Sequence, residues 1–304
     1  MILLWGIPGD TPLKLVAREL QRRRTSFVML DQHEISNWTI DLRVSEEVHG
    51  GLRTGKEAIL LENVRAAYVR PYDVRQLPSF SGLAPQDPAL VRAMEIGDAL
   101  LSWSDMTPAK VVNRPAAMAP NSSKPFQGMQ IQASGFLVPR TLITTDVEAA
   151  REFWVRHTNV IYKSSSSVRS IVAKLCAKHE PRFADLRWCP TQFQEYVEGT
   201  DYRVHVVGER IFACRILSRA DDYRYACRMG LETKVTTAKL PQEITERCTR
   251  LAHQIGLPVA GVDLRRTPAG RWYCFEVNPS PGFSYYEEAT GQPIAKAVAE
   301  YLSA

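Results

Sequence analysis

Short apolar runs alternate with segments of helical spacing in the N-terminal third of the chain. Helical spacing of apolar side chains predicts helices over residues 11–24 and 89–104, with Thr11 as the N-cap and Pro12 at the first position of the first helix. The apolar runs predict three strands: residues 2–7, 26–31 and 66–69. This strand–helix–strand order predicts a small parallel α/β domain.

The rest of the chain contains further helices and a larger number of strands. Helical spacing recurs in four segments: 124–134, 146–156, 241–255 and 294–302. Apolar, β-rich runs predict five strands: 138–143, 159–162, 192–197, 201–207 and 210–217. The predicted fold class is therefore α/β, with α+β character in the C-terminal part. We expect three units: an N-terminal α/β domain (1–105), a central subdomain (106–188) and a C-terminal subdomain with an antiparallel sheet (189–304).

The clearest chemical signal lies in a predicted hairpin near the C-terminus. Residues 259–266 and 271–278 are β-rich runs, and the Thr-Pro-Ala-Gly segment between them has the length and composition of a hairpin turn. If Arg266, at the end of the first strand, lies opposite Arg271, at the start of the second, then Asp263 lies opposite Cys274. Because side chains alternate along a strand, Glu276 then shares a face with Asp263.

Asn278 is expected on that same face, which makes three oxygen donors. The opposite face is expected to be apolar, with Tyr273, Phe275 and Val277. An ordinary hairpin with a solvated polar face is the alternative, and it is weaker because the polar face ends in ligand-type groups only. Two carboxylates and an amide suit Mg²⁺, which leaves its other positions to water and phosphate. We expect a metal site at Asp263, Glu276 and Asn278, with Mn²⁺ as an alternative ion.

Composition narrows the class of protein. The chain has 304 residues, 45% of them hydrophobic and 23% charged, which is ordinary for a soluble globular enzyme of about two domains. Its net charge of +5 is too mild and scattered to indicate nucleic-acid binding. We expect no membrane span and no signal peptide. The six cysteines form no CxxC pair, so reduced thiols in the cytoplasm are the simplest interpretation.

Three further segments have features of a nucleotide site, although each is weak alone. Lys163 ends an apolar strand and precedes the four serines 164–167, whose backbone N–H groups could approach phosphate; a flexible turn is the alternative. Residues 194–199 form a strand that runs into a turn and could present backbone groups to a purine, or simply be an edge strand. Asp201 and Arg203 share a strand face with His205, and an ordinary half-exposed sheet would look the same.

Two further arginines, Arg215 and Arg224, follow this strand closely in the sequence. Arginines beside a carboxylate-bound metal are typical of a clamp for polyphosphate or carboxylate. The sequence contains no signal for a Ser, Cys or His nucleophile.

Together these motifs resemble the ATP-grasp superfamily, and within it the ligases related to the ribosomal-protein glutamylating enzyme RimK and to glutathione synthetase. The resemblance covers residues 1–304 and is strongest from 191 to 302. The motif order carries it: Asn-Arg-Pro at 113–115, two lysines at 124 and 163, Gln-Glu-Tyr-Val at 194–197, Asp-Tyr-Arg at 201–203, and Glu-x-Asn-x-x-Pro-Gly-Phe at 276–283. Residues 139–144 and the segment 192–224 are also similar to graspetide synthetases, which macrocyclise ribosomal peptides.

The resemblance implies an ATP-grasp fold: a pre-ATP-grasp domain, a central lid subdomain and a C-terminal antiparallel-sheet domain. It implies ATP and Mg²⁺ as cofactors. It assigns roles to named positions: phosphate contacts to Lys124, Lys163, Ser164, Ser165 and Ser166; adenine contacts to Gln194, Glu195, Tyr196 and Val197; ribose to Asp201; and the γ-phosphate or acyl phosphate to Arg203, Arg215 and Arg224. In this chain the phosphate loop is rich in serine rather than glycine.

The implied activity is an ADP-forming carboxylate–amine ligase that works through an acyl phosphate and acts on an amino acid or a peptide. One alternative is a peptide ligase that forms side-chain ester or amide crosslinks in a ribosomal precursor. Another is a nucleotide-binding module without catalysis, which is ranked last because all expected metal ligands are present. The acceptor is an amine or a hydroxyl. A homodimer is left open, because dimers are common among similar ligases.

Overall fold

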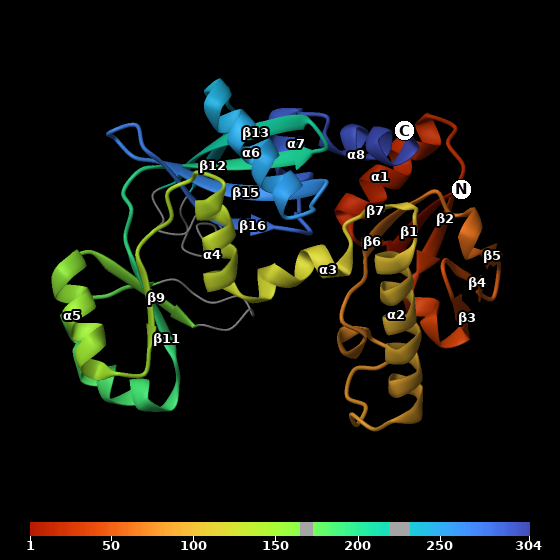
Figure 1. The fold of residues 1–304 in the computed structure, drawn as a ribbon, viewed down its shortest axis with the longest axis horizontal. Helices are drawn as coiled ribbons and strands as arrows, with labels where there is room; N and C mark the ends of the chain where they lie inside the picture. The colour runs from red at the N-terminus through yellow and green to blue at the C-terminus, as the bar shows by residue number, and fades with distance from the viewer. Residues whose placement is uncertain (165–172, 219–231) are drawn as a thin grey trace.

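The computed structural model describes residues 1–164, 173–218 and 232–304, which form three units (Figure 1). The N-terminal unit is built on a parallel sheet in the order β2-β1-β6-β7. Its strands are β1 Ile2–Gly6, β2 Phe27–Asp31, β6 Ala66–Arg70 and β7 Lys110–Val112. The small parallel α/β domain is confirmed. Its sheet takes in β7, which lies beyond residue 105, where the sequence pattern placed the end of this domain.

Two helices cover opposite faces of this sheet. Leu3 and Trp5 pack with residues of α2 (Pro88–Met106), whereas Ile2 and Leu4 pack with residues of α1 (Thr11–Arg22). Alternation along β1 therefore divides the core into two layers.

The first residue of α1 differs from the prediction. Asp10, rather than Thr11, is the N-cap, because its carboxylate accepts a hydrogen bond of 2.9 Å from the Leu13 N–H. Thr11 and Pro12 occupy the first two helical positions.

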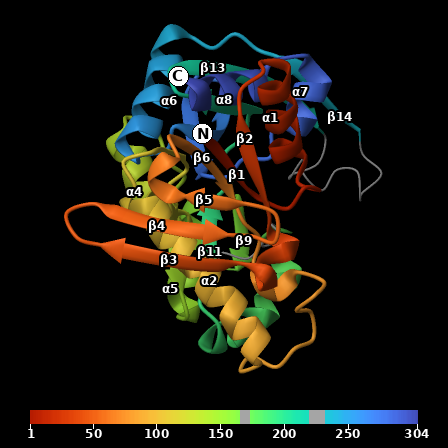
Figure 2. The same cartoon turned by 90° about the vertical axis from the view of Figure 1, so that its right-hand side faces the viewer.

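A small antiparallel sheet beside α2 was not predicted from the sequence. Figure 2 shows it at the front of the N-terminal unit. It consists of β3 Thr39–Val44, β4 Val48–Arg53 and β5 Ala58–Leu60. Short 3₁₀ segments connect the elements of this unit: η1 Gln32–Asn37, η2 Leu61–Asn63 and η3 Val74–Gln76.

The central unit is a four-stranded antiparallel sheet with helices on one face. The order is β10-β9-β11-β8, with β8 Thr141–Thr144, β9 Val160–Ser164, β10 Ala173–Lys174 and β11 Thr191–Glu195. Phe193 packs with Ala150 of α5 (Val147–His157) and Phe183 of η5 (Ala177–Trp188). The other face of this sheet carries Lys163 and is not covered by these helices. Three short helical elements lead into this unit: α3 Pro115–Met118, η4 Ala119–Ser122 and α4 Lys124–Ala133.

The C-terminal unit is a five-stranded antiparallel sheet in the order β14-β13-β12-β15-β16. Its strands are β12 Thr200–Val207, β13 Arg210–Ser218, β14 Thr233–Thr237, β15 Val259–Arg266 and β16 Trp272–Asn278. Leu251 of α6 (Gln242–Gln254) and Ile131 of α4 pack with Val262 on one face. Two helices close the chain: α7 Ser284–Thr290 and α8 Ile294–Ser303.

One hydrophobic cluster joins the first and last units. Leu4 and Leu13 pack in the same buried cluster as Phe283, Ile294 and Val298. This contact places α8 against α1 and the loop after β16 against the N-terminal sheet. In the described part of the chain, no helix combines the length and apolarity that crossing a membrane requires.

Candidate nucleotide and metal site

The predicted metal hairpin contains a β-bulge that the sequence pattern does not reveal. Leu264 lies opposite Cys274, whereas the preceding residue on β15, Asp263, lies opposite Glu276. Phe275 is therefore an extra residue on β16. The predicted pairing of Asp263 with Cys274 is wrong, and the two carboxylate residues face each other directly.

The bulge also changes which side chains share the metal face. Cys274 and Val277 are three positions apart, yet both are buried in the core formed with α6 and α4. Phe275 lies with its ring centroid 5.2 Å from the guanidinium carbon of Arg265, a β15 residue on the Asp263 face. The expected apolar face of Tyr273, Phe275 and Val277 is wrong as well, because Tyr273 pairs with Arg265 and only Val277 points into the core.

Asn278 completes the set of oxygen donors. It lies opposite Gly261 on β15. Gly261 is two positions before Asp263 on the same strand, so both residues belong to the same face. The side-chain oxygen of Asn278 accepts a hydrogen bond of 3.0 Å from the Ser280 N–H. Among the described residues, no cluster of three or more His, Cys, Asp or Glu side chains has metal-binding geometry. The candidate site thus consists of two carboxylates and an amide, a donor set that fits Mg²⁺ better than a transition metal.

Arg203 is a buried cation beside this donor set. Its side chain is 6% exposed, and its Nη1 donates to Asp263 Oδ1 at 2.8 Å. Gly261 makes room for it, since a Cβ added there would overlap the guanidinium group. A buried arginine so close to a predicted metal ligand would place positive charge where a transferred phosphate needs it.

His205 lies beside Arg203 in a buried aromatic environment. Arg203 Nε is 3.4 Å from His205 Nε2, and the imidazole lies 5.0 Å from the ring of Tyr286. Burial, and then the Arg203 charge, hold the pKa of His205 well below its ordinary value. His205 is therefore neutral at physiological pH and serves as an uncharged neighbour of the arginine.

The other two predicted arginines do not join Arg203 in the described structure. Arg215 pairs with Tyr202, whereas Arg203 pairs with Cys214, so Arg215 projects from the opposite face of the sheet. Its side chain is exposed there. The prediction that Arg215 gathers with Arg203 is therefore not met. Arg224 lies outside the residues that the structure describes.

Asp201 is engaged by a neighbouring arginine. Arg265 donates to both of its carboxylate oxygens, from Nε at 2.6 Å and from Nη2 at 2.9 Å. The same guanidinium donates from Nη1 to the Val197 carbonyl at 2.8 Å. Arg265 therefore connects the predicted adenine segment with the predicted ribose residue, and its own role was not foreseen.

The predicted lid residues divide between two faces of the central sheet. Lys163 lies opposite Gln192 on β11, so both share with Gln194 the face that α5 and η5 do not cover. Glu195 points the other way, because its side chain accepts from the Arg140 N–H at 3.0 Å and lies 3.7 Å from His157. Any contribution of Glu195 to the adenine site therefore comes from its backbone.

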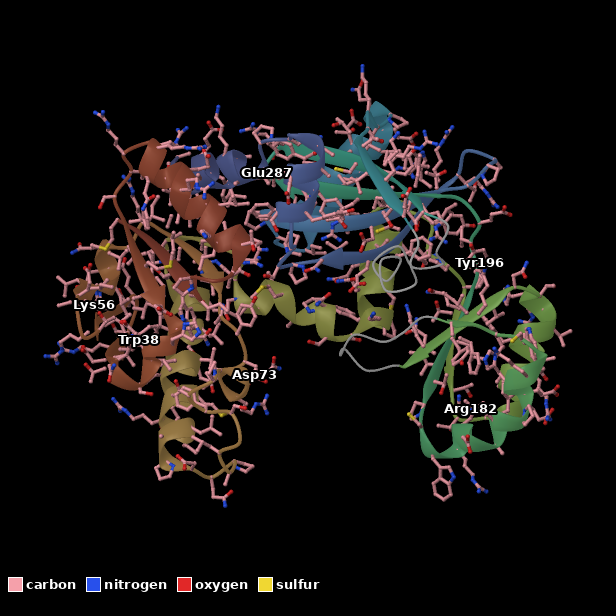
Figure 3. The ribbon with its side chains drawn as sticks, turned by 180° about the vertical axis from the view of Figure 1, so that it is seen from behind. Trp38, Lys56, Asp73, Arg182, Tyr196 and Glu287 are labelled. Atoms are coloured by element: carbon pink, nitrogen blue, oxygen red, sulfur yellow. The ribbon has the colours of Figure 1, made fainter. Side chains whose placement is uncertain are left out.

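Tyr196 and Val197 follow at the junction with the C-terminal sheet, where Figure 3 shows Tyr196. The Tyr196 ring lies 4.5 Å from Lys174 Nζ and 5.8 Å from the Arg265 guanidinium carbon. In the parts of the chain described here, the Val197 N–H has no hydrogen-bond acceptor, although the residue is 7% exposed. A free backbone donor in a buried position is suited to the edge of a purine.

The phosphate-binding positions are described only in part. Lys124 is the first residue of α4 and is half-buried. Ser164 ends β9, opposite Thr191. Ser165 and Ser166 lie outside the described residues.

Two residues of the site were missed as functional candidates. Asn113, directly after β7, donates from Nδ2 to the carbonyls of Val259, at 2.6 Å, and Pro279, and so contacts β15 and the residue that follows β16. Arg70, at the end of β6, donates to Ser280 Oγ at 2.8 Å. The sequence signal was present in each case, as a polar residue that ends an apolar strand just before a proline or an Arg-Pro pair.

Comparison with known proteins identifies the family. Residues 127–302 match the RimK-like ATP-grasp domain. The chain belongs to the RimK-like ATP-grasp family. The resemblance inferred from the motifs, and the ATP-grasp fold class, are thereby confirmed.

Curated relatives in this family are named probable alpha-L-glutamate ligases. The protein from Pasteurella multocida (strain Pm70) is 29% identical over 189 residues, which cover 58% of this chain and 59% of the relative. The protein from Cellvibrio japonicus (strain Ueda107) is 27% identical over 242 residues, or 76% of this chain and 79% of the relative. In three of these relatives, the part that aligns with this chain is less than two thirds of the relative's own length.

Solved structures match the whole chain. The macrocyclase MdnC from Microcystis aeruginosa MRC, bound with precursor peptide MdnA, has a TM-score of 0.83, 22% identity and 99% coverage of both chains. The ATP-grasp ligase PsnB, complexed with minimal precursor, Mg and ADP, has a TM-score of 0.82 and 26% identity, with 99% of this chain and 96% of PsnB covered. This RimK-like chain therefore shares its fold with MdnC and PsnB over nearly its whole length.

Proposed function

We propose that this RimK-like protein is an ADP-forming ligase that activates a carboxylate as an acyl phosphate and joins it to an amine. The observation that carries the proposal is the Asp263–Glu276 pair, with Asn278 on the same face and the buried Arg203 beside it. Asp263, Glu276 and Asn278 would hold Mg²⁺, which supplies charge neutralisation at the phosphates when bound.

The reaction proceeds in two displacements. An oxygen of the substrate carboxylate attacks the γ-phosphorus of ATP, the bond to the β-phosphate oxygen breaks, and ADP leaves. The acceptor nitrogen then attacks the acyl carbon, loses its proton, and inorganic phosphate leaves. Little covalent chemistry falls to the protein, which positions the groups and stabilises charge.

The residues of the chain divide this work. Arg203 contributes a fixed, desolvated positive charge next to Asp263, where the transferred phosphoryl group would lie. Lys124 and Lys163 contribute mobile positive charge for the phosphates. The Val197 N–H and the Glu195 backbone bind the adenine edge, and the Asp201–Arg265 pair lies beside the ribose. Contributions of Ser164, Ser165, Ser166, Arg215 and Arg224 stay predictions.

The substrate that we favour is a peptide. PsnB, solved with a minimal precursor, matches 99% of this chain with a TM-score of 0.82 and 26% identity, whereas D-alanyl-alanine synthetase A from Vibrio cholerae matches with a TM-score of 0.60 and 13% identity. A peptide ligase of this kind could also use a side-chain hydroxyl as acceptor and form an ester, and this is the second candidate function. Both products arise from the same acyl phosphate and differ only in the attacking atom.

The test is a substrate panel assayed for ADP, phosphate and product mass. Amino acids, dipeptides and peptides encoded near the gene are incubated with ATP and Mg²⁺. We expect acceptor-dependent release of ADP and phosphate, with loss of one water per linkage formed. Resistance of the linkage to mild base distinguishes an amide from an ester. AMP and pyrophosphate would contradict the acyl-phosphate scheme, and tight ATP binding without turnover on any acceptor would favour the non-catalytic module.

A further inference from the structure

The loop of residues 279–282, which follows the metal strand β16, is held by the N-terminal unit. Asn113 donates to the Pro279 carbonyl, and Phe283, directly after the loop, is fully buried in the cluster that contains Leu13. The loop in turn holds a predicted metal ligand, because the Ser280 N–H donates to the Asn278 side-chain oxygen at 3.0 Å. The position of that oxygen therefore depends on where the loop lies.

Arg70 is a charged residue of the N-terminal unit that contacts this loop. Its side chain is 9% exposed. Its Nη1 donates to Ser280 Oγ at 2.8 Å and lies 3.4 Å from the Pro281 carbonyl oxygen. One guanidinium nitrogen thus contacts both a side chain and the backbone of the loop.

The orientation of Arg70 is set from the other side. Its Nε and Nη2 donate to the two carboxylate oxygens of Asp10, at 2.9 and 3.1 Å. Asp10 is itself fixed, because it caps α1 through the Leu13 N–H and accepts from the Tyr72 hydroxyl at 3.3 Å. The guanidinium plane is therefore locked between the N-terminal sheet and the loop.

We propose that Arg70 is a positioning residue for the metal site. Held by Asp10, it fixes Ser280 and thereby the Asn278 oxygen, and so couples the N-terminal unit to metal affinity. The planar fork of arginine is needed, since a lysine has one nitrogen and cannot span Asp10 and Ser280 together. This inference rests on the proposed function, because it requires that Asn278 binds the metal.

The test measures Mn²⁺ binding by electron paramagnetic resonance, with a non-hydrolysable ATP analogue present. The variants are Arg70→Lys, Ser280→Ala and the double variant. The control is Arg75→Lys, which alters an exposed arginine of the same unit paired with Asp73 at 2.8 Å. Residues that orient metal ligands typically change metal affinity by 10- to 100-fold, so we expect Arg70→Lys to weaken Mn²⁺ binding by about tenfold. Ser280→Ala should weaken Mn²⁺ binding less than Arg70→Lys does. The fold-loss of Mn²⁺ affinity in the double variant should be smaller than the product of the fold-losses in the two single variants.

Steady-state kinetics separate positioning from a general loss of folded protein. In Arg70→Lys we expect the Mg²⁺ concentration for half-maximal rate to rise while kcat at saturating Mg²⁺ stays near that of the wild type. A merely structural role would lower kcat at every Mg²⁺ concentration. Ser280 is exposed, so its alanine variant also tests the proposal without loss of the fold.

The outcomes distinguish this inference from the proposed function. Wild-type Mn²⁺ affinity in both Arg70→Lys and Ser280→Ala, with the wild type binding Mn²⁺ and turning over, overturns the positioning role alone. A wild type that binds no Mn²⁺ with nucleotide overturns the proposed function, and the positioning role with it.

Discussion

Arg203 illustrates how single residues define this site. The sequence placed it on one face with Asp201 and His205, and the register confirms that placement. It did not reveal that Arg203 would be buried against Asp263, because strand alternation gives a face but no depth. A buried cation paired with a carboxylate is costly to desolvate, so this pair is weak evidence of a stabilising role.

Replacement of Arg203 tests its charge. We expect Arg203→Met to lower kcat by about 10²- to 10³-fold, the usual cost of removing one charge-stabilising group from an active site. The control is Arg210→Met. Arg210 is an exposed arginine on the same sheet, and it forms an ion pair with Glu300. Both are assayed as ADP release at saturating ATP and Mg²⁺. An Arg203→Met variant with activity within twofold of the wild type would show that Arg203 is structural.

His205 predicts a pH dependence of stability. Its folded-state pKa is held well below the unfolded value, chiefly by burial and also by Arg203, so the unfolded chain takes up a proton more readily between the two values. The free energy of unfolding should therefore fall as the pH falls below about 6.5, by up to about 1.4 kcal/mol per pH unit. Urea denaturation of the wild type and of His205→Gln between pH 5 and 8 checks this. An equal slope in both proteins would refute the assignment.

Strands and helices were largely predictable, whereas the register of the metal hairpin was not. The hydrophobic pattern indicated β15 and β16 to within a residue, and a regular turn then implied that Asp263 opposes Cys274. Two features change that register. Arg266 lies opposite Trp272 rather than Arg271, which places Leu264 opposite Cys274, and the bulge at Phe275 then places Glu276 opposite Asp263. The spacing of Cys274 and Val277, three apart and both apolar, was the available signal.

Other differences at the scale of elements have similar causes. The β3-β4-β5 sheet was missed because its strands are mostly half-exposed or exposed and carry no continuous apolar run. Arg215 was grouped with Arg203 because the two are close in sequence, although an even-numbered separation across a hairpin can place side chains on opposite faces.

The bulge itself predicts an effect on nucleotide binding. Phe275 lies beside Arg265 on the metal face and is half-buried, so we expect Phe275→Ala to raise the KM for ATP several-fold with little change in Tm. The control is Trp188→Ala, which removes an aromatic side chain that is 76% exposed at the end of η5. ATP saturation curves for both variants provide the comparison. An unchanged KM in Phe275→Ala would place this ring outside the nucleotide site.

At the scale of the whole molecule, the first and last units share one hydrophobic cluster, so we expect them to unfold together. The sequence indicated three successive units, but not that α1 and α8 share a core, because contacts between distant segments leave no periodic signal. Ile294 is fully buried in the cluster that also contains Leu13. The loop after β16 enters the same cluster through Phe283, so the metal strand is anchored to the N-terminal unit.

Ile294→Ala tests this connection. The expected loss in the free energy of unfolding is about 2–5 kcal/mol, the usual range for truncation of a buried isoleucine. The control, Val155→Ala, alters a side chain that is 82% exposed and should change stability by less than about 0.5 kcal/mol. Urea denaturation of the variant is followed by fluorescence and by circular dichroism, and we expect both signals to change at the same urea concentration. Separate transitions would show that the N-terminal unit folds independently of α8.

The proposed function requires that Asp263, Glu276 and Asn278 hold the metal of an ADP-forming ligase. The most direct test measures ADP and phosphate release across the peptide panel for the wild type, Glu276→Gln and the control Glu288→Gln, an exposed change on α7. We expect acceptor-dependent release of both products by the wild type and the control, and loss of this release in Glu276→Gln. Equal turnover by Glu276→Gln, or formation of AMP and pyrophosphate by the wild type, would contradict the proposed function.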